Sequence, residues 1–193
     1  MALPAFVIAV LLLLLTPGPT NTLLAVSGAS AGMRRSLPLV GAELAGYLTT
    51  IIPLSTFAGP WLSGQPQAAL AVKLVAAIWV VMLAARLWRH PPRLGGESPV
   101  TFRGVYVTTV LNPKGLIIGL ALIPPSVTSV LEPLPHLAVF AALTVTAALL
   151  WVAFGATVLR RAASARPIVF GRLAASFLLV FAASLAGRAF GLI

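Results

Sequence analysis

Three charged side chains, Glu43, Lys73 and Lys114, lie well inside long apolar stretches of this 193-residue sequence, whereas the other 13 fall in loops or near the ends of the stretches. A charge at the centre of a membrane-spanning helix costs about 2.5–3.5 kcal/mol on insertion scales, so such residues face the interior of a helix bundle and usually have a function. Lys114 lies deepest in its stretch, and an ammonium group there can hold the carboxylate of a substrate. The alternative is that Lys114 is simply neutralised by Glu43.

Glu43 is the one carboxylate inside an apolar stretch. A carboxyl group in this setting is a candidate proton carrier or a contact for a substrate ammonium, and the alternative is a structural partner for a lysine. Lys73 lies closer to the opposite end of its own stretch, from which its side chain can also reach toward the membrane surface. We expect Glu43 and Lys73 to serve proton or ion coupling.

Prolines interrupt two of the apolar stretches, at Pro17 and Pro19 in the first and at Pro113 in the fourth. A proline inside a helix removes an amide donor and leaves the carbonyl four residues earlier without its partner. The carbonyls concerned are those of Leu13, Leu15 and Thr109. At membrane depth such groups are tolerated only where protein or a water-filled cavity satisfies them.

A helix can restart after each interruption. Thr16 or Gly18 can cap a helix that begins at Pro17 or Pro19, and Asn112-Pro113 forms the same kind of pair. Two half-helix amino termini then point their positive dipole ends at a common centre, which suits an anion such as a carboxylate. The alternative is a pair of kinks that serve packing alone. The predicted transport path consists of Pro17, Gly18, Pro19, Asn21, Asn112, Pro113 and Lys114.

The composition indicates what must position these residues, because 60% of the chain is hydrophobic, 8% is charged and the mean hydropathy is +1.05. A soluble domain carries roughly 45–50% apolar and about 25% charged residues, so we predict an all-α integral membrane protein. The stretches lack the alternating pattern of barrel strands. The six predicted spans are approximately Leu3–Val26, Leu37–Gly59, Ala68–Trp88, Val105–Ile123, Leu137–Leu159 and Ile168–Ala189.

The basic residues predict an orientation for these spans. Arginines fill the first, third and fifth predicted loops, whereas the amino terminus and the second and fourth loops have none. Because basic loops stay in the cytoplasm, both termini are predicted outside. The net charge of +10 then anchors one membrane face, with contacts to anionic lipids as a minor addition and no binding of nucleic acid.

When the two halves of the sequence are aligned with each other, Thr16-Pro17 falls opposite Asn112-Pro113. Three spans in each half is an odd number, so the second half would lie inverted relative to the first. The prediction is one membrane transport domain over residues 1–193, built from inverted repeats at about 1–96 and 97–193. Interrupted helices at matching places in inverted repeats are the best sequence pointer to the site of a secondary transporter.

The chain has few side chains that could serve as catalytic groups, because it contains no cysteine or aspartate and two histidines. We therefore expect no enzyme, no cofactor and no metal site. The alternatives to a transporter are a channel, a membrane scaffold that transports nothing, or, less favoured, an intramembrane enzyme that uses serine or glutamate. The sequence leaves open the substrate, the coupling ion and whether the chain forms a homo-oligomer.

Several motifs together resemble the LysE/RhtB amino-acid exporter family, over nearly the whole chain and in order. They are Thr16-Pro17-Gly18-Pro19-Thr20-Asn21, Gly41 with Gly46, Val72-Lys73-Leu74, Phe102-Arg103-Gly104 and Leu111-Asn112-Pro113-Lys114-Gly115. The resemblance implies a multi-pass exporter in the bacterial inner membrane, which moves amino acids or close relatives by proton-coupled antiport. It also implies that the motif residues line the transport path.

The chain departs from the family pattern at Thr20, where an asparagine is frequent, and at Gly41 and Gly46, which are five rather than four residues apart. Ile117-Ile118 replaces a commonly aromatic pair. These departures bear on the substrate more than on the mechanism. With one carboxylate inside a span, a neutral amino acid is favoured over a strongly cationic one.

Overall fold

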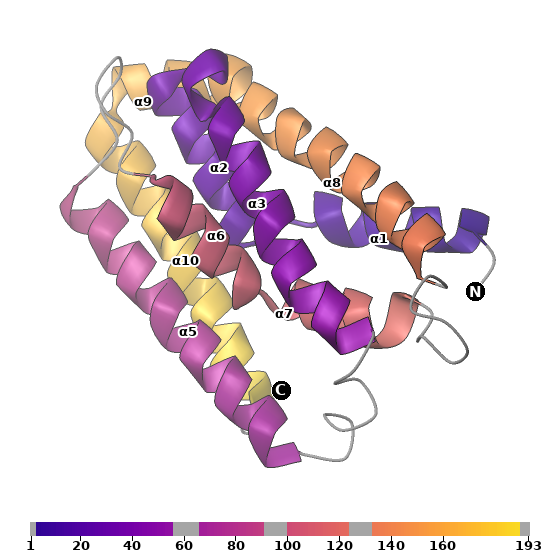
Figure 1. The fold of residues 1–193 in the computed structure, drawn as a ribbon. Coiled ribbons are helices and arrows are strands. Elements are labelled where there is room, and N and C mark those ends of the chain that lie inside the picture. The colour runs from indigo at the N-terminus through magenta and orange to yellow at the C-terminus, as the bar shows by residue number, and fades with distance from the viewer. Residues whose placement is uncertain (1–2, 56–65, 91–99, 124–132, 190–193) are drawn as a thin grey trace.

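A computed structural model of the chain describes residues 3–55, 66–90, 100–123 and 133–189 (Figure 1). Every regular element in these ranges is a helix, so the all-α prediction is confirmed for them. The elements in order are α1 (Leu3–Leu15), α2 (Pro19–Ala31), α3 (Met33–Pro53), α5 (Pro66–Arg89), α6 (Phe102–Val110), α7 (Pro113–Ile117), the π-helix η2 (Ile118–Leu122), α8 (Leu134–Phe154), the π-helix η3 (Gly155–Leu159), α9 (Arg160–Ala165) and α10 (Pro167–Ala189).

The turn between α2 and α3 is shorter than the hydropathy predicts. The first apolar stretch ends at Val26, but α2 continues to Ala31 through small residues that lower the hydropathy without breaking a helix. The chain reverses at Gly32, whose φ of 81° is readily reached by a residue without a Cβ. Since α3 begins at Met33, the arginines placed in a loop lie in its first turn.

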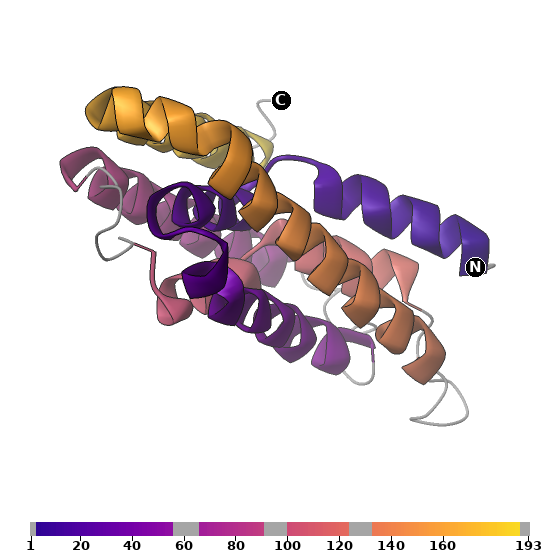
Figure 2. The ribbon, with the colours of Figure 1, turned by 90° about the horizontal axis from the view of Figure 1, so that it is seen from above.

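The helices form a central group with an added pair on one side (Figures 1 and 2). Helix α2 packs against α8 and η3, and α3 packs against both α6 and α8. Helices α5 and α10 lie side by side along their length and form the added pair. Helix α1 leaves the line of α2 at a bend of 61° and lies along α8.

Length and apolar character single out a few of these helices as able to cross a membrane. The continuous stretch Leu134–Ala162, with 29 residues, meets both criteria, and α1 with α2 meets them as one bent pair. Ile168–Ser184 is a shorter apolar helix. These are one or two spans among the described residues, so the six-span arrangement stays a prediction.

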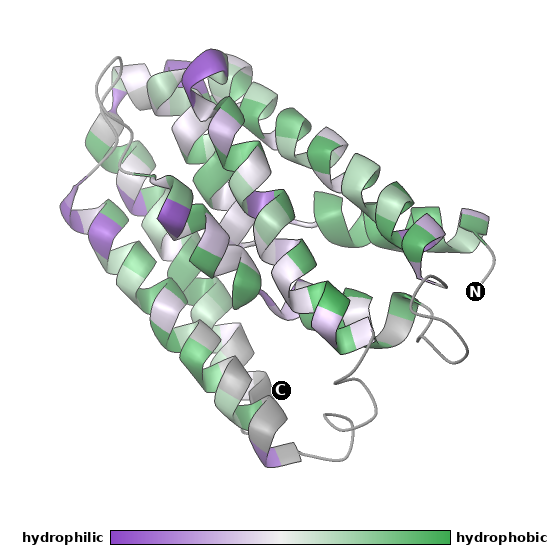
Figure 3. Ribbon diagram, viewed as in Figure 1, coloured by the Kyte–Doolittle hydropathy of each residue, from purple (hydrophilic) through white to green (hydrophobic). Residues whose placement is uncertain are grey.

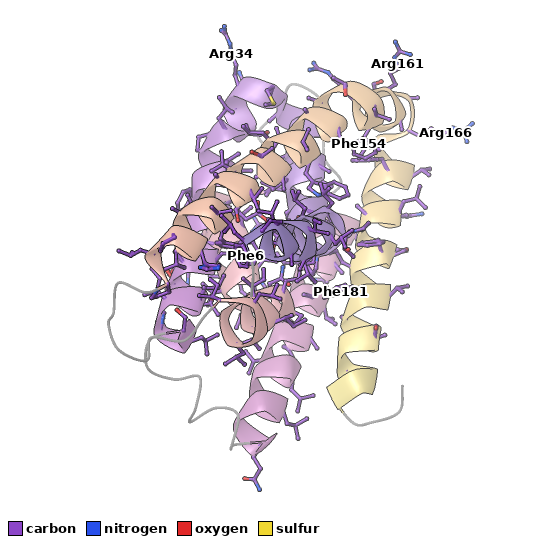
Figure 4. The ribbon with its side chains drawn as sticks, turned by 90° about the vertical axis from the view of Figure 1, so that its right-hand side faces the viewer. Phe6, Arg34, Phe154, Arg161, Arg166 and Phe181 are labelled. Carbon is purple, nitrogen blue, oxygen red and sulfur yellow. The ribbon has the colours of Figure 1, made fainter. Side chains whose placement is uncertain are left out.

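Apolar side chains cover the outside of the helices as well as the inside. Leu12 on α1 is 66% exposed and Val180 on α10 is 69% exposed. One apolar cluster of the interior contains Phe6 of α1 (Figure 4), Ile51 of α3 and Phe140 of α8. Large exposed apolar surfaces of this kind indicate a partner protein or a membrane.

The hydrophilic residues gather at one end of the helices, where α3 begins and α5 ends (Figure 3). Arg34, Arg161 and Arg166 project from this end (Figure 4), and all three side chains are exposed. The loops predicted around 59–67, 89–104 and 124–136 fall largely outside the described residues, as do Glu97 and Glu132.

Two glycines bring α2 and η3 together backbone to backbone. A Cβ added to Gly28 would overlap the carbonyl oxygen of Val152, and one added to Gly155 would overlap the carbonyl oxygen of Ala25. Because backbone atoms rather than flexible side chains occupy this space, a larger residue forces the two helices apart. This contact fixes how α2 sits against the end of α8.

The close contact predicts that Gly28→Ala destabilises the protein by about 1–3 kcal/mol, the usual cost of overfilling a packed interior. The measurement is unfolding of the detergent-solubilised protein followed by circular dichroism. Gly41→Ala is the matched control, because Gly41 is exposed and a Cβ there meets nothing within 4 Å. Equal stability of the two variants would contradict the prediction.

Candidate functional site

The first helix break separates α1 from α2 around the predicted proline motif. Helix α1 ends at Leu15, and Gly18 caps α2, with Pro19 at its first position. A proline is well suited to that position, because its fixed φ matches the helix and its missing N–H would have no helical partner. Gly18 and Pro19 are buried, whereas Pro17 is exposed.

The second break separates α6 from α7 and is capped by a side chain. Asn112 precedes Pro113, and its Oδ1 accepts a hydrogen bond of 3.1 Å from the backbone N–H of Lys114. The carbonyl of Thr109, predicted to lose its partner, accepts a bond of 3.0 Å from the backbone N–H of Asn112. Asparagine is among the best residues at this capping position.

Side chains from three elements supply donors to the end of α1. The Nδ2 of Asn21 donates to the carbonyls of Leu14 at 2.8 Å and Thr16 at 2.9 Å. The Nε1 of Trp151 also donates to the Leu14 carbonyl, at 3.4 Å, and the Nζ of Lys114 donates to the Thr16 carbonyl. The open backbone at this break is therefore satisfied by α2, α8 and α7.

The carbonyls that receive these side chains differ from those predicted. The sequence pointed to Leu13 and Leu15, but the side-chain donors reach the carbonyls of Leu14 and Thr16. The helical pattern of α1 continues to Thr16, whose backbone N–H donates to the carbonyl of Leu12 at 3.0 Å.

The two breaks meet in the interior of the protein. The Nδ2 of Asn112 donates to the Oγ1 of Thr20 at 3.2 Å and to the hydroxyl of Tyr47 at 3.4 Å. The Oγ1 atoms of Thr20 and Thr109 lie 3.3 Å apart. All four residues are buried. The starts of α2 and α7 thus lie side by side, in what we call the polar junction: Thr20, Asn21, Tyr47, Thr109, Asn112 and Lys114.

Glu43 brings an acidic side chain close to this junction, which already contains the basic side chain of Lys114. Glu43 is 2% exposed, and its Oε2 has no hydrogen-bond partner among the described residues. Lys114 is 7% exposed and donates to the backbone of the first break. The two groups attract each other, but no hydrogen bond or ion pair joins them in the described structure. The neutralisation of Lys114 by Glu43 without direct contact stays a prediction.

Lys73, the third charge predicted to matter, lies on α5, and its side chain falls outside the described residues. The remaining predicted residues belong to the two breaks. The polar junction also contains Tyr47 and Thr109, which the sequence did not single out, and Thr20, which the sequence marked only through the motif that carries the family resemblance. Tyr47 had a signal in the sequence, because it follows Glu43 by one helical turn and so shares its face of α3.

Glycines allow the elements of the junction to approach one another. A Cβ on Gly18 would lie 3.3 Å from both Cε and Nζ of Lys114, so Gly18 leaves room for the ammonium beside the first break. A Cβ on Gly46 would lie 2.7 Å from the Cβ of Thr109, and this glycine permits the close approach of α3 to α6. The junction is therefore tightly packed both beside Gly18, at the first break, and beside Gly46, between α3 and α6.

Comparison with known proteins gives one distant relative. No protein-family model matches the chain, and no solved structure matches it. A protein of Klebsiella pneumoniae subsp. pneumoniae, named cysteine/O-acetylserine efflux protein, is 27% identical over 118 residues, which make up 60% of this chain and 60% of that protein. The chain thus matches less than two thirds of the relative's length, and over that part it is similar to an efflux protein.

The bond between the two breaks predicts energetic coupling between Thr20 and Asn112. Thr20→Val keeps the shape of the side chain and removes its hydroxyl, and Asn112→Ala removes the donor. We expect a double-mutant cycle of unfolding free energies to give a coupling of about 0.5–1.5 kcal/mol.

Thr157→Val is the control for this cycle, because Thr157 is exposed and its hydroxyl bonds only within its own helix, to the Ala153 carbonyl at 2.7 Å. Paired with Asn112→Ala, it should give no coupling. A Thr20–Asn112 coupling that is no larger than this control would contradict the contact between the breaks.

Proposed function

We propose that the chain is a secondary active exporter of amino acids or closely related metabolites in the bacterial inner membrane. Its transport path passes through the polar junction. The observation that carries the proposal is the meeting of two proline-broken helices, bonded through Thr20 and Asn112, with buried charges of both signs beside them. The efflux relative supports the direction of transport and the class of substrate.

The chemistry of the junction fits a substrate with one carboxylate and one ammonium. The ammonium of Lys114 has three donors, and its carbonyl partner at Thr16 occupies one of them. A substrate carboxylate can take the others, aided by the positive end of α2. The unpartnered Oε2 of Glu43 can accept a hydrogen bond from a substrate ammonium. An uncharged side chain on the substrate then needs no further partner.

Transport in this proposal follows from motion of one half of the chain against the other. Residues 1–96 contain the first break and residues 97–193 contain the second, as inverted repeats would. The bond from Asn112 to Thr20 and the bond from Lys114 to Thr16 both cross between these halves. Opening the junction to either side exchanges these bonds for bonds to substrate or water.

The proposed orientation places the basic end of the helices in the cytoplasm and both termini outside. Exposed arginines at one end and exposed apolar side chains along the helices support it. Glu43 then lies between the two faces, where it either carries the coupling proton or holds the substrate ammonium.

The proposal is tested by efflux from host cells loaded with each of the twenty amino acids, homoserine and O-acetylserine. We expect the chain to accelerate loss of a subset of these and an uncoupler of the proton gradient to abolish the acceleration. Full-rate loss in the presence of the uncoupler would indicate a channel. No acceleration for any solute would indicate a scaffold.

Lys114→Met is expected to lower the export rate by about 10- to 100-fold, because a hydrogen bond to a charged group contributes about 1.5–3 kcal/mol. The assay is initial efflux of the best substrate, normalised to the amount of protein in the membrane fraction. Arg161→Met is the matched control, since it removes one exposed positive charge far from the junction. Export that Lys114→Met leaves unchanged would refute the carboxylate site.

Glu43→Gln separates the two roles of this carboxyl, because glutamine keeps the size and loses the titration. If Glu43 carries the proton, export by the variant becomes independent of external pH between about 5 and 8. If Glu43 holds the ammonium, the pH dependence stays and the half-saturating substrate concentration rises about tenfold. A variant with neither change would exclude Glu43 from coupling and binding.

A further inference from the structure

A cluster of basic side chains lies where α5 ends beside α10. Arg86, Arg89 and His90 are exposed on the last turn of α5 and just after it. On α10, the guanidinium of Arg172 lies over the ring of Trp88, 5.3 Å from its centroid. This cation–π contact connects the two helices at the end of the protein where the hydrophilic residues gather.

Two surface grooves meet at this cluster. The first is apolar, has a volume of about 330 Å³ and is lined by Val81, Ala84, Ala85, Trp88, Arg89 and Leu179. The second has a volume of about 490 Å³ and is lined by Met82, Ala85, Arg86, Arg89 and His90. Ala85 and Arg89 line both, so the apolar groove leads directly to a groove with two arginines.

The positive charge of the cluster is not compensated within the described part of the chain. Glu43 is the one carboxylate there, and it is buried beside the polar junction. No ion pair of Arg86, Arg89 or Arg172 occurs among the described residues. An anion that carries a long apolar chain would match both the charge and the groove.

We propose that this surface binds an anionic phospholipid of the cytoplasmic leaflet. Arg86 and Arg89 hold the phosphate of the headgroup, since guanidinium groups match phosphate oxygens in a two-point geometry. One acyl chain lies in the apolar groove along Val81 and Leu179. The inference rests on the proposed function in one respect, namely that the chain lies in a membrane.

The positions of the aromatic and basic residues favour a lipid over a small soluble anion. Trp88 is 46% exposed beside the arginines, and tryptophan is enriched at the level of lipid headgroups. A soluble phosphate would use the arginines and leave the apolar groove unfilled. Basic residues near the cytoplasmic face attract anionic lipids in general, and the groove adds a place for one particular molecule.

The test uses the full chain in nanodiscs that contain equal parts of phosphatidylcholine and phosphatidylglycerol. After release from the nanodisc, mass spectrometry of the intact protein gives the ratio of the two lipids that stay bound. We expect phosphatidylglycerol to dominate for the natural chain. In Arg86→Gln/Arg89→Gln the preference should fall about 25-fold, as each basic residue contributes about fivefold.

Two further variants make the result specific. Arg34→Gln/Arg161→Gln removes the same charge from exposed positions at the same end and should lower the preference much less, because these residues do not line the grooves. Ala85→Trp fills the place where the grooves meet and should remove the bound lipid without changing any charge. An equal loss in the arginine control, or full retention in Ala85→Trp, would overturn the site.

The outcomes for the lipid site and for the exporter are separable. A chain that shows no phosphatidylglycerol preference but exports amino acids overturns the lipid site alone. A chain that keeps the preference in nanodiscs and accelerates no efflux supports the lipid site and overturns the exporter. Displacement of the bound lipid by soluble glycerol phosphate would overturn the role of the apolar groove.

Discussion

The backbone at the end of α1 requires hydrogen-bond donors that its own helix cannot supply, and this requirement organises the centre of the protein. Asn21, Trp151 and Lys114 come from α2, α8 and α7, and each donates to a carbonyl of Leu14 or Thr16. Unpaired polar backbone is costly wherever water is excluded. The same contacts that satisfy the break therefore fix three other elements around it.

An acidic side chain, Glu43, and a basic one, Lys114, are both buried at this centre, and no direct ion pair joins them among the described residues. Lys114 is held by a backbone carbonyl, and the Oε2 of Glu43 has no partner among the described residues. A buried charge that lacks a close partner is expensive and is retained where it has a function. Gly18 leaves space beside Lys114, and Gly46 lets α3 approach α6.

Local chemistry explains which features could be predicted from the sequence. The capping of α7 by Asn112 follows from asparagine before proline, because these residues act on their immediate neighbours. For α2 the same chemistry left Thr16 and Gly18 as alternatives, and the cap is Gly18. The bond between Thr20 and Asn112 could not be derived in this way, since it depends on the packing of segments 92 residues apart. The turn at Gly32 was also missed, because hydropathy reports the polarity of a segment rather than the φ of one residue.

The pairing of α5 with α10 has a consequence for how the chain is made. A ribosome adds about 5–20 residues per second, so α5 is complete several seconds before α10 follows it. During that interval the face of α5 that α10 later covers is without its partner. The α5–α10 pair can therefore form only after the rest of the described helices have been made.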